Sequence, residues 1–167
     1  GAGQMVSLSI MDPSGSLEYA GSTVSTAGGN FQFSYPLANP VNGRYTALLR
    51  GMGVSVPVST YFDYLEMTNI AISGITLKPG FQNAVTSYTA AVDGTVSSVR
   101  VTPTSSDSQA KITVNSLPVS NGMASSPISL ESGENTISVV LNGRDGKTSR
   151  TYTINISKDF GVVEEGT

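Results

Sequence analysis

Apolar residues recur at every second position in many short runs along the chain. Val6, Leu8 and Ile10, for example, alternate with Ser7 and Ser9, and this is the pattern of a β-strand with one buried face. Gly, Asn, Asp and Pro separate the runs, and no window shows the 3.6-residue period of an amphipathic helix. The pattern therefore predicts an all-β protein of antiparallel strands with almost no helix.

In the first half of the chain, Asp12-Pro13-Ser14-Gly15 favours a turn after the first run, because these residue types suit turn backbone angles. Phe31, Phe33 and Tyr35 predict a core strand with aromatic residues on one face. Pro57 has no amide hydrogen, which favours an edge position or a bulge. The strands expected in this half are 6–10, 17–24, 31–35, 45–49 and 54–64.

The second half shows the same alternation, and residues 142–147, rich in Gly, Asn and Asp, predict the turn of a hairpin. The expected strands are 70–77, 88–92, 99–101, 112–114, 128–130, 137–141 and 152–156. The fold class predicted from both series is two tandem immunoglobulin-like antiparallel β-sandwich domains. We expect domains at 1–66 and 67–160 and a flexible tail at 161–167. The junction at 64–69 has no Gly or Pro and is expected to be short and semi-rigid.

Five sequence motifs in the second half occur in an order and spacing that resemble a known family. They are Ile72-Ser73-Gly74-Ile75-Thr76-Leu77, Thr86-Ser87-Tyr88-Thr89, Ile112-Thr113-Val114-Asn115, Gly133-Glu134-Asn135-Thr136-Ile137 and Thr151-Tyr152-Thr153-Ile154. Through them, residues 69–158 resemble the bacterial cadherin-like β-sandwich domains found beside catalytic and anchoring modules of secreted proteins.

Residues 2–64 are similar to small immunoglobulin-like repeats of Gram-positive surface and polysaccharide-degrading proteins. The similarity rests on Asp12-Pro13-Ser14-Gly15, Gly29-Asn30-Phe31, Asn42-Gly43-Arg44-Tyr45-Thr46 and Gly53-Val54. Such repeats usually begin with a strand upstream of the position of Gly1, so this resemblance implies that the first domain lacks its first strand. Both resemblances imply a spacer or accessory module in an extracellular or cell-surface setting.

Composition narrows the possible functions. Charged residues form only 13% of the chain and the net charge is −3, so there is no basic stripe for nucleic acid. No apolar stretch is long enough to span a bilayer, and we expect no membrane insertion. Cys is absent, which excludes disulfides and thiolate chemistry and leaves the compartment open.

The candidate chemistry is sparse because the chain also contains no His. Without His and Cys, hydrolytic triads and most transition-metal sites are excluded. Paired carboxylates would still suit a glycosidase, but Asp12, Asp93 and Asp145 lie beside Gly or Pro and fit turns. Calcium needs six to eight oxygen ligands, and Asp63, Glu66 and Asn69 near the junction are too few. We therefore predict no enzyme activity, no cofactor and no catalytic, cofactor-binding or metal residues.

Carbohydrate binding is the alternative function, since sugars stack on exposed aromatic rings. Trp is absent, and most aromatic residues are in the inward phase of their strands. Tyr61 and Tyr19 are the candidate carbohydrate contacts, because each is out of phase with the inward-facing positions of its expected strand or weakly placed in that strand. A Lys–Asn isopeptide bond would need a buried Lys, Asn and carboxylate together, and Lys78 and Asn155 show no acidic partner in the sequence.

The sequence thus predicts a non-catalytic structural spacer or accessory module of a larger secreted or cell-surface bacterial protein. The alternative is a carbohydrate-binding module attached to a polysaccharide-degrading enzyme. The expected partners are neighbouring modules of the same polypeptide and, for the alternative, cell-wall or substrate polysaccharide.

Overall fold

The computed structural model describes residues 3–52 and 56–159. The chain divides into two compact units, Gly1–Tyr64 (unit 1) and Leu65–Thr167 (unit 2). The division lies slightly before the expected boundary at 66/67, because Leu65 is buried in the core of unit 2. Gly53-Val54, the first residues of the expected strand 54–64 and the expected tail 161–167 lie outside the described residues.

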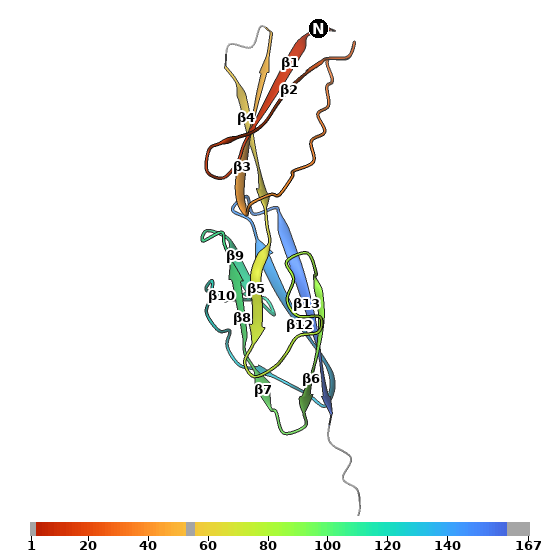
Figure 1. The fold of residues 1–167 in the computed structure, drawn as a ribbon, viewed down its shortest axis with the longest axis vertical. Coiled ribbons are helices and arrows are strands. Elements are labelled where there is room, and N and C mark those ends of the chain that lie inside the picture. The colour runs from red at the N-terminus through yellow and green to blue at the C-terminus, as the bar shows by residue number, and fades with distance from the viewer. Residues whose placement is uncertain (1–2, 53–55, 160–167) are drawn as a thin grey trace, which may run out of the picture. The chain divides into compact units, whose positions relative to one another are not determined.

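Unit 1 contains one antiparallel sheet whose strands confirm four of the five expected runs. The strands are β1 (Met5–Met11), β2 (Leu17–Val24), β3 (Gly43–Gly51) and β4 (Val58–Tyr64). Their order in the sheet is β2-β1-β3-β4 (Figure 1). Pro57 lies directly before β4 rather than inside a strand, and β4 is an edge strand of the sheet.

A long connection between β2 and β3 supplies the second layer of unit 1. Its aromatic side chains Phe33 and Tyr35 pack on the inward residues Leu8, Ile10 and Tyr45 of the sheet. The prediction of a hydrogen-bonded strand at 31–35 is wrong, because this stretch pairs with no strand among the described residues. The prediction that its rings face the core is correct for Phe33 and Tyr35, whereas Phe31 is 44% exposed.

Unit 2 is a β-sandwich of one larger sheet and two short strand pairs. Its strands are β5 (Met67–Ile72), β6 (Ser87–Asp93), β7 (Ser98–Val99), β8 (Val101–Ser105), β9 (Lys111–Val114), β10 (Leu117–Val119), β11 (Ile128–Ser129), β12 (Gly133–Asn142) and β13 (Ser149–Asp159). The larger sheet has the order β10-β9-β12-β13-β6, while β5 pairs with β8 and β7 with β11. The all-β prediction is confirmed, and the described residues contain no helix.

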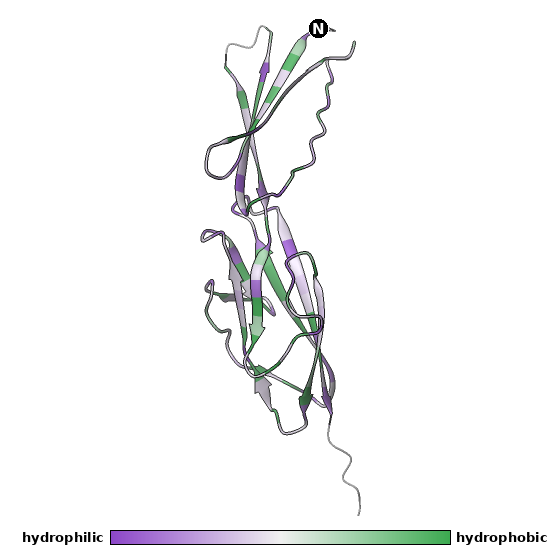
Figure 2. Cartoon of the chain, in the orientation of Figure 1, coloured by the Kyte–Doolittle hydropathy of each residue, from purple (hydrophilic) through white to green (hydrophobic). Residues whose placement is uncertain are grey.

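The core of unit 2 comes from the inward residues that the alternating pattern predicts. Figure 2 shows hydrophobic and more polar residues alternating along the strands. In β13, Tyr152, Ile154 and Ile156 are completely buried, and the residues between them are partly exposed. Val139 of β12 lies opposite Tyr152 and is equally buried.

Two features of unit 2 differ from the expected strands. The larger sheet contains one parallel pair, because β13 runs parallel to β6. In the order of this sheet, β13 lies between β12 and β6. The expected strand 70–77 ends at Ile72, because Gly74 adopts a positive φ of 74° and turns the chain. Ile75 then forms only an isolated bridge to Ile72.

In each unit the chain enters at one end and leaves at the other (Figure 1). In unit 1, β1 and β4 are both antiparallel to β3, so they run in the same direction. In unit 2, the amide of Met67 bonds to Tyr152 near the start of β13. Asp159 then lies seven residues further along β13, or about 23 Å at the usual rise of a strand.

Candidate functional site

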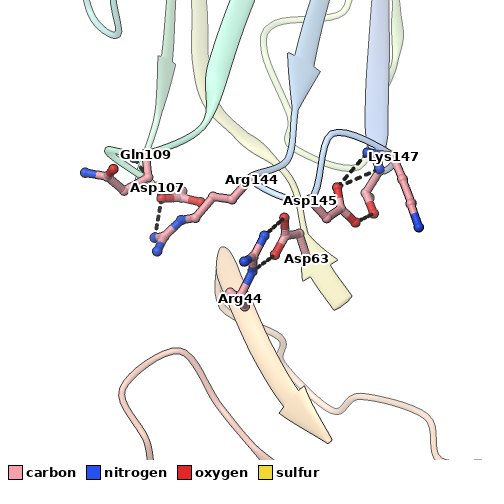
Figure 3. Close-up of polar contacts among 8 residues, drawn as sticks. Arg44, Asp63, Asp107, Gln109, Arg144, Asp145 and Lys147 are labelled. Carbon is pink, nitrogen blue, oxygen red and sulfur yellow. Dashed lines mark hydrogen bonds and ion pairs between the residues drawn. The ribbon is translucent and has the colours of Figure 1, made fainter. Parts of the chain in front are cut away.

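Tyr61 lies in a small polar cluster on the outer face of the unit 1 sheet. Arg44 of β3 is opposite Asp63 of β4, and the guanidinium donates two hydrogen bonds to the carboxylate, Nε to Oδ1 at 2.9 Å and Nη2 to Oδ2 at 3.2 Å (Figure 3). The Arg44 Cζ lies 5.4 Å from the centre of the Tyr61 ring, which is within cation–π range. Tyr61 is 54% exposed.

Tyr19, the other candidate carbohydrate contact, lies on the opposite face. It is paired with the core residue Ile10, and its ring stacks on Tyr35 with centroids 4.4 Å apart. Residues directly opposite each other in a ladder point to the same side of the sheet, so Tyr19 faces inward and Tyr61 outward. The structure therefore does not bring the two rings together, and of these two rings only Tyr61 presents an exposed aromatic face.

Three aspartates serve as turn residues, as their Gly and Pro neighbours predict. Asp12 Oδ1 accepts hydrogen bonds from the amides of Ser14 and Ser16, each at 2.8 Å. Hydrogen bonds from Ser14 and Ser16 lower the pKa of Asp12. The amide of Thr95 bonds to Asp93 at 2.8 Å and lowers the pKa of that carboxyl too.

Asp145 caps the turn of the hairpin between β12 and β13. Its Oδ1 accepts from the amides of Lys147 and Thr148 at 2.9 and 2.8 Å, and its Oδ2 accepts from the Thr148 hydroxyl at 2.6 Å (Figure 3). These bonds account for an aspartate at this position without any catalytic role.

Other carboxylates of unit 2 are engaged in ion pairs. Arg144 Nη2 donates to Asp107 Oδ1 at 2.8 Å, and Arg150 Nη1 donates to Glu66 Oε1 at 3.2 Å. Asp107 Oδ2 is buried without a hydrogen-bond partner. Within residues 3–52 and 56–159, no group of three or more His, Cys, Asp or Glu could hold a metal ion.

The sequence could not reveal these ion pairs, because their members are far apart along the chain. Arg44 and Asp63 meet through the β3–β4 register, and Arg150 and Glu66 are 84 residues apart. The sequence also could not reveal that Lys78, Asn155 and Glu134 line one surface groove in unit 2, because they are far apart along the chain. Lys78 and Glu134 are exposed, so this groove lacks the buried setting that isopeptide formation requires.

Three buried tyrosine hydroxyls stabilise local chain geometry. The Tyr45 hydroxyl accepts from the amide of Val41, four residues upstream, which matches the corner role its position suggests. The Tyr152 hydroxyl accepts from the amide of Met67 at 2.9 Å, and Tyr88 donates to the Val85 carbonyl at 2.8 Å. Burial raises the pKa of Tyr45 and of Tyr152.

An open apolar pocket of about 240 Å³ lies at one end of unit 1. It is lined by Val6, Phe31, Leu49, Arg50, Gly51 and Val58. Phe31 and Val58 are also among the exposed large hydrophobic residues. The pocket offers apolar contact area rather than convergent polar groups.

Comparison with known proteins identifies the second half of the chain. Residues 66–159 match the sequence model of the "Cadherin-like beta sandwich domain" family. A protein of Evansella cellulosilytica named "Putative membrane protein" is 30% identical over 108 residues, covering 62% of this chain. The aligned part is 16% of that relative's length. No solved structure matches, and no helix among the described residues is long and apolar enough to cross a membrane.

Proposed function

Because the chain belongs, through residues 66–159, to the cadherin-like β-sandwich domains, we propose that it is a structural spacer or accessory module of a larger secreted or cell-surface bacterial protein. Domains of this family are generally non-catalytic and typically extracellular. The carboxylates described above support a structural role for the chain, because their hydrogen bonds and ion pairs stabilise turns and join separate segments of the chain.

The observation that carries this proposal is the path of the chain through each unit. A spacer must add length between its two neighbouring modules, and it does so only when the chain enters and leaves at opposite ends. Unit 2 meets this condition, because Met67 lies beside the start of β13 and the chain leaves at Asp159. Unit 1 meets it through the common direction of β1 and β4.

The strand directions also suit resistance to pulling. In unit 2 the first strand, β5, and the last, β13, begin at the same end and belong to different sheets. Tension between Met67 and Asp159 therefore acts along the strands. It loads the β13 ladders to β12 and β6 together rather than one hydrogen bond at a time.

Single-molecule pulling tests the mechanical role directly, because the chain has no native Cys and handles can be placed at will. With Thr68→Cys and Asp159→Cys handles, we expect unit 2 to unfold in one step at a force several-fold above that of a peeling control. The control uses Glu134→Cys and Asp159→Cys, where Glu134 is opposite Ser157 near the end of the same ladder. Equal forces in the two geometries would contradict the proposal.

Carbohydrate binding is retained as a second candidate function because Tyr61 presents an exposed ring beside Arg44 and Asp63. Affinity electrophoresis against soluble cell-wall and plant polysaccharides tests it. Retardation that disappears in Tyr61→Ala and persists in Tyr61→Phe would support sugar stacking and replace the spacer function. Unretarded migration of the unmodified chain in every gel would exclude binding of the polysaccharides tested.

A further inference from the structure

Residues 31–37 have the features of a β-strand but no neighbouring strand. Their exposure alternates, with Phe33, Tyr35 and Leu37 partly buried against the sheet and the residues between them exposed. Within the described part of the chain, no backbone amide or carbonyl of residues 31–37 forms a hydrogen bond. In Figure 1 this stretch runs as an extended segment alongside the sheet of unit 1.

Unit 1 is also poorly covered by its own residues. Its buried core cluster consists of Leu8, Ile10, Tyr45 and Ala47, whereas the core cluster of unit 2 has eighteen members. Exposed large hydrophobic residues are concentrated in unit 1 and include Met5, Val24, Phe31, Met52 and Val58. A sandwich needs two layers to bury its apolar faces, and here the second layer is a single unpaired segment.

The start of this segment lies close to the start of β1. The amide of Gly3 donates to the Ser25 carbonyl at 2.9 Å, and the amide of Thr26 donates to the Asn30 carbonyl at 2.8 Å. Chain arriving at Gly3 therefore comes within a short turn of residue 31. A strand that runs toward Gly3 would be antiparallel to residues 31–35, which lead away from that end.

We propose that residues 31–35 pair with one additional β-strand of the same polypeptide, which lies outside residues 1–167 and completes the second layer of unit 1. This strand is antiparallel to residues 31–35. Its side chains are apolar at every second position, because one of its faces covers the pocket formed by Val6, Phe31, Leu49 and Val58.

The small area favours a strand of the same polypeptide over a second copy of the chain. Five paired residues cover a strip about 17 Å long and about 5 Å wide. Stable association between separate proteins usually buries about 800 Å² per partner, far more than such a strip. A covalently connected strand acts at an effective concentration in the millimolar range, so a small contact is sufficient. The proposal does not depend on the spacer function.

Amide hydrogen exchange at residues 31–35 tests this pairing. Three chains are compared: residues 1–167 alone, the chain extended by about fifteen parental residues before Gly1, enough for a strand and a turn, and a control with a Gly-Ser extension of equal length. Alternate amides of residues 31–35 are expected to exchange at least tenfold more slowly in the parental extension than in the other two chains. The slow exchange should not depend on protein concentration.

Three other results would overturn the proposal. Slow exchange in residues 1–167 alone, increasing with protein concentration, would assign the partner strand to a second copy; slow exchange there at every concentration would show that the segment is already paired. Equally fast exchange in all three chains would show that residues 31–35 accept no strand from the parental extension. The thermal midpoint of unit 1, measured on the same samples, should rise only with the parental extension.

Discussion

Individual polar side chains form hydrogen bonds to backbone amides of distant strands. Tyr152 is fully buried within the sheet, and its hydroxyl accepts the amide of Met67, the first residue of β5. Met67 is itself fully buried, so water cannot replace that bond. A single hydroxyl thus ties the first strand of unit 2 to its last strand.

Replacing this hydroxyl should be costly. In Tyr152→Phe the ring still fills the core, but the amide of Met67 is left buried without a partner, which typically costs about 1–3 kcal/mol. Urea unfolding should show this loss in the free energy of unfolding of unit 2. Tyr61→Phe is the matched control, because Tyr61 is 54% exposed, and it should leave the unfolding free energy unchanged. Equal effects of both variants would contradict this role of Tyr152.

Burial of the same tyrosine should make unit 2 sensitive to alkaline pH. Desolvation raises the pKa of Tyr152 in the folded state above its ordinary value of 10.0. This contribution to stability is therefore complete below pH 10 and is lost as the pH rises through the folded-state pKa. Urea midpoints of unit 2 measured from pH 8 upward should fall less steeply in Tyr152→Phe than in the unmodified chain, and parallel curves would show that Tyr152 is not responsible.

Residue-level prediction from the sequence succeeded where the cause is local. Asp12, Asp93 and Asp145 bond to amides two to four residues away, so neighbouring Gly and Pro were sufficient evidence. The partner of Tyr152 is 85 residues distant, and no local pattern indicates it. The orientation of Tyr19 was missed for the same reason, because its inward face results from the pairing with Ile10.

At the scale of elements, the β12–β13 hairpin is the longest ladder in unit 2. Ten residue pairs join the two strands, from Gly133 opposite Lys158 to Asn142 opposite Ser149. The connecting turn depends on Gly146, whose φ of 67° suits glycine, and on the cap provided by Asp145. The turn and the ladder therefore specify the same register.

Removing the cap should weaken the hairpin. Asp145→Ala eliminates bonds to the amides of Lys147 and Thr148 and should lower the unfolding free energy of unit 2 by about 1 kcal/mol. Lys147→Ala is the control in the same turn, because Lys147 contributes its backbone amide to the cap. Thermal unfolding of both variants checks this, and a midpoint of Asp145→Ala equal to that of the control would contradict the role of the cap.

The alternating pattern predicted the strands well and their partners poorly. A period of two identifies which face of a strand is buried, as it did for Ile154 and Ile156. It does not specify which strand lies alongside, so the parallel pairing of β13 with β6 was not foreseen. Residues 31–35 show the same limit, since their pattern is that of a strand although no neighbour is present among the described residues.

At the scale of the whole chain, the two units differ greatly in apolar burial. The core cluster of unit 2 has eighteen buried residues and that of unit 1 has four. Because apolar burial is the dominant favourable term in folding, unit 2 should be much the more stable unit.

Chemical denaturation should therefore separate the two units. Amides of β1 and β3 should lose protection at lower urea concentrations than amides of β12 and β13, giving two transitions in a hydrogen-exchange titration. Leu8→Ala should move only the first transition, and Ile154→Ala only the second. A single transition that shifts with either substitution would show that the units unfold together.

The position of β13 in its sheet has a consequence for how the protein is made. The last strand of unit 2 lies between β12 and β6. Until residues 149–159 emerge from the ribosome, the only partner of β6 among the described residues is the isolated bridge from Lys78 to Thr89. The larger sheet therefore cannot close strand by strand in the order in which its strands are synthesised. We expect unit 2 to complete its fold only after residues 149–159 have left the ribosome.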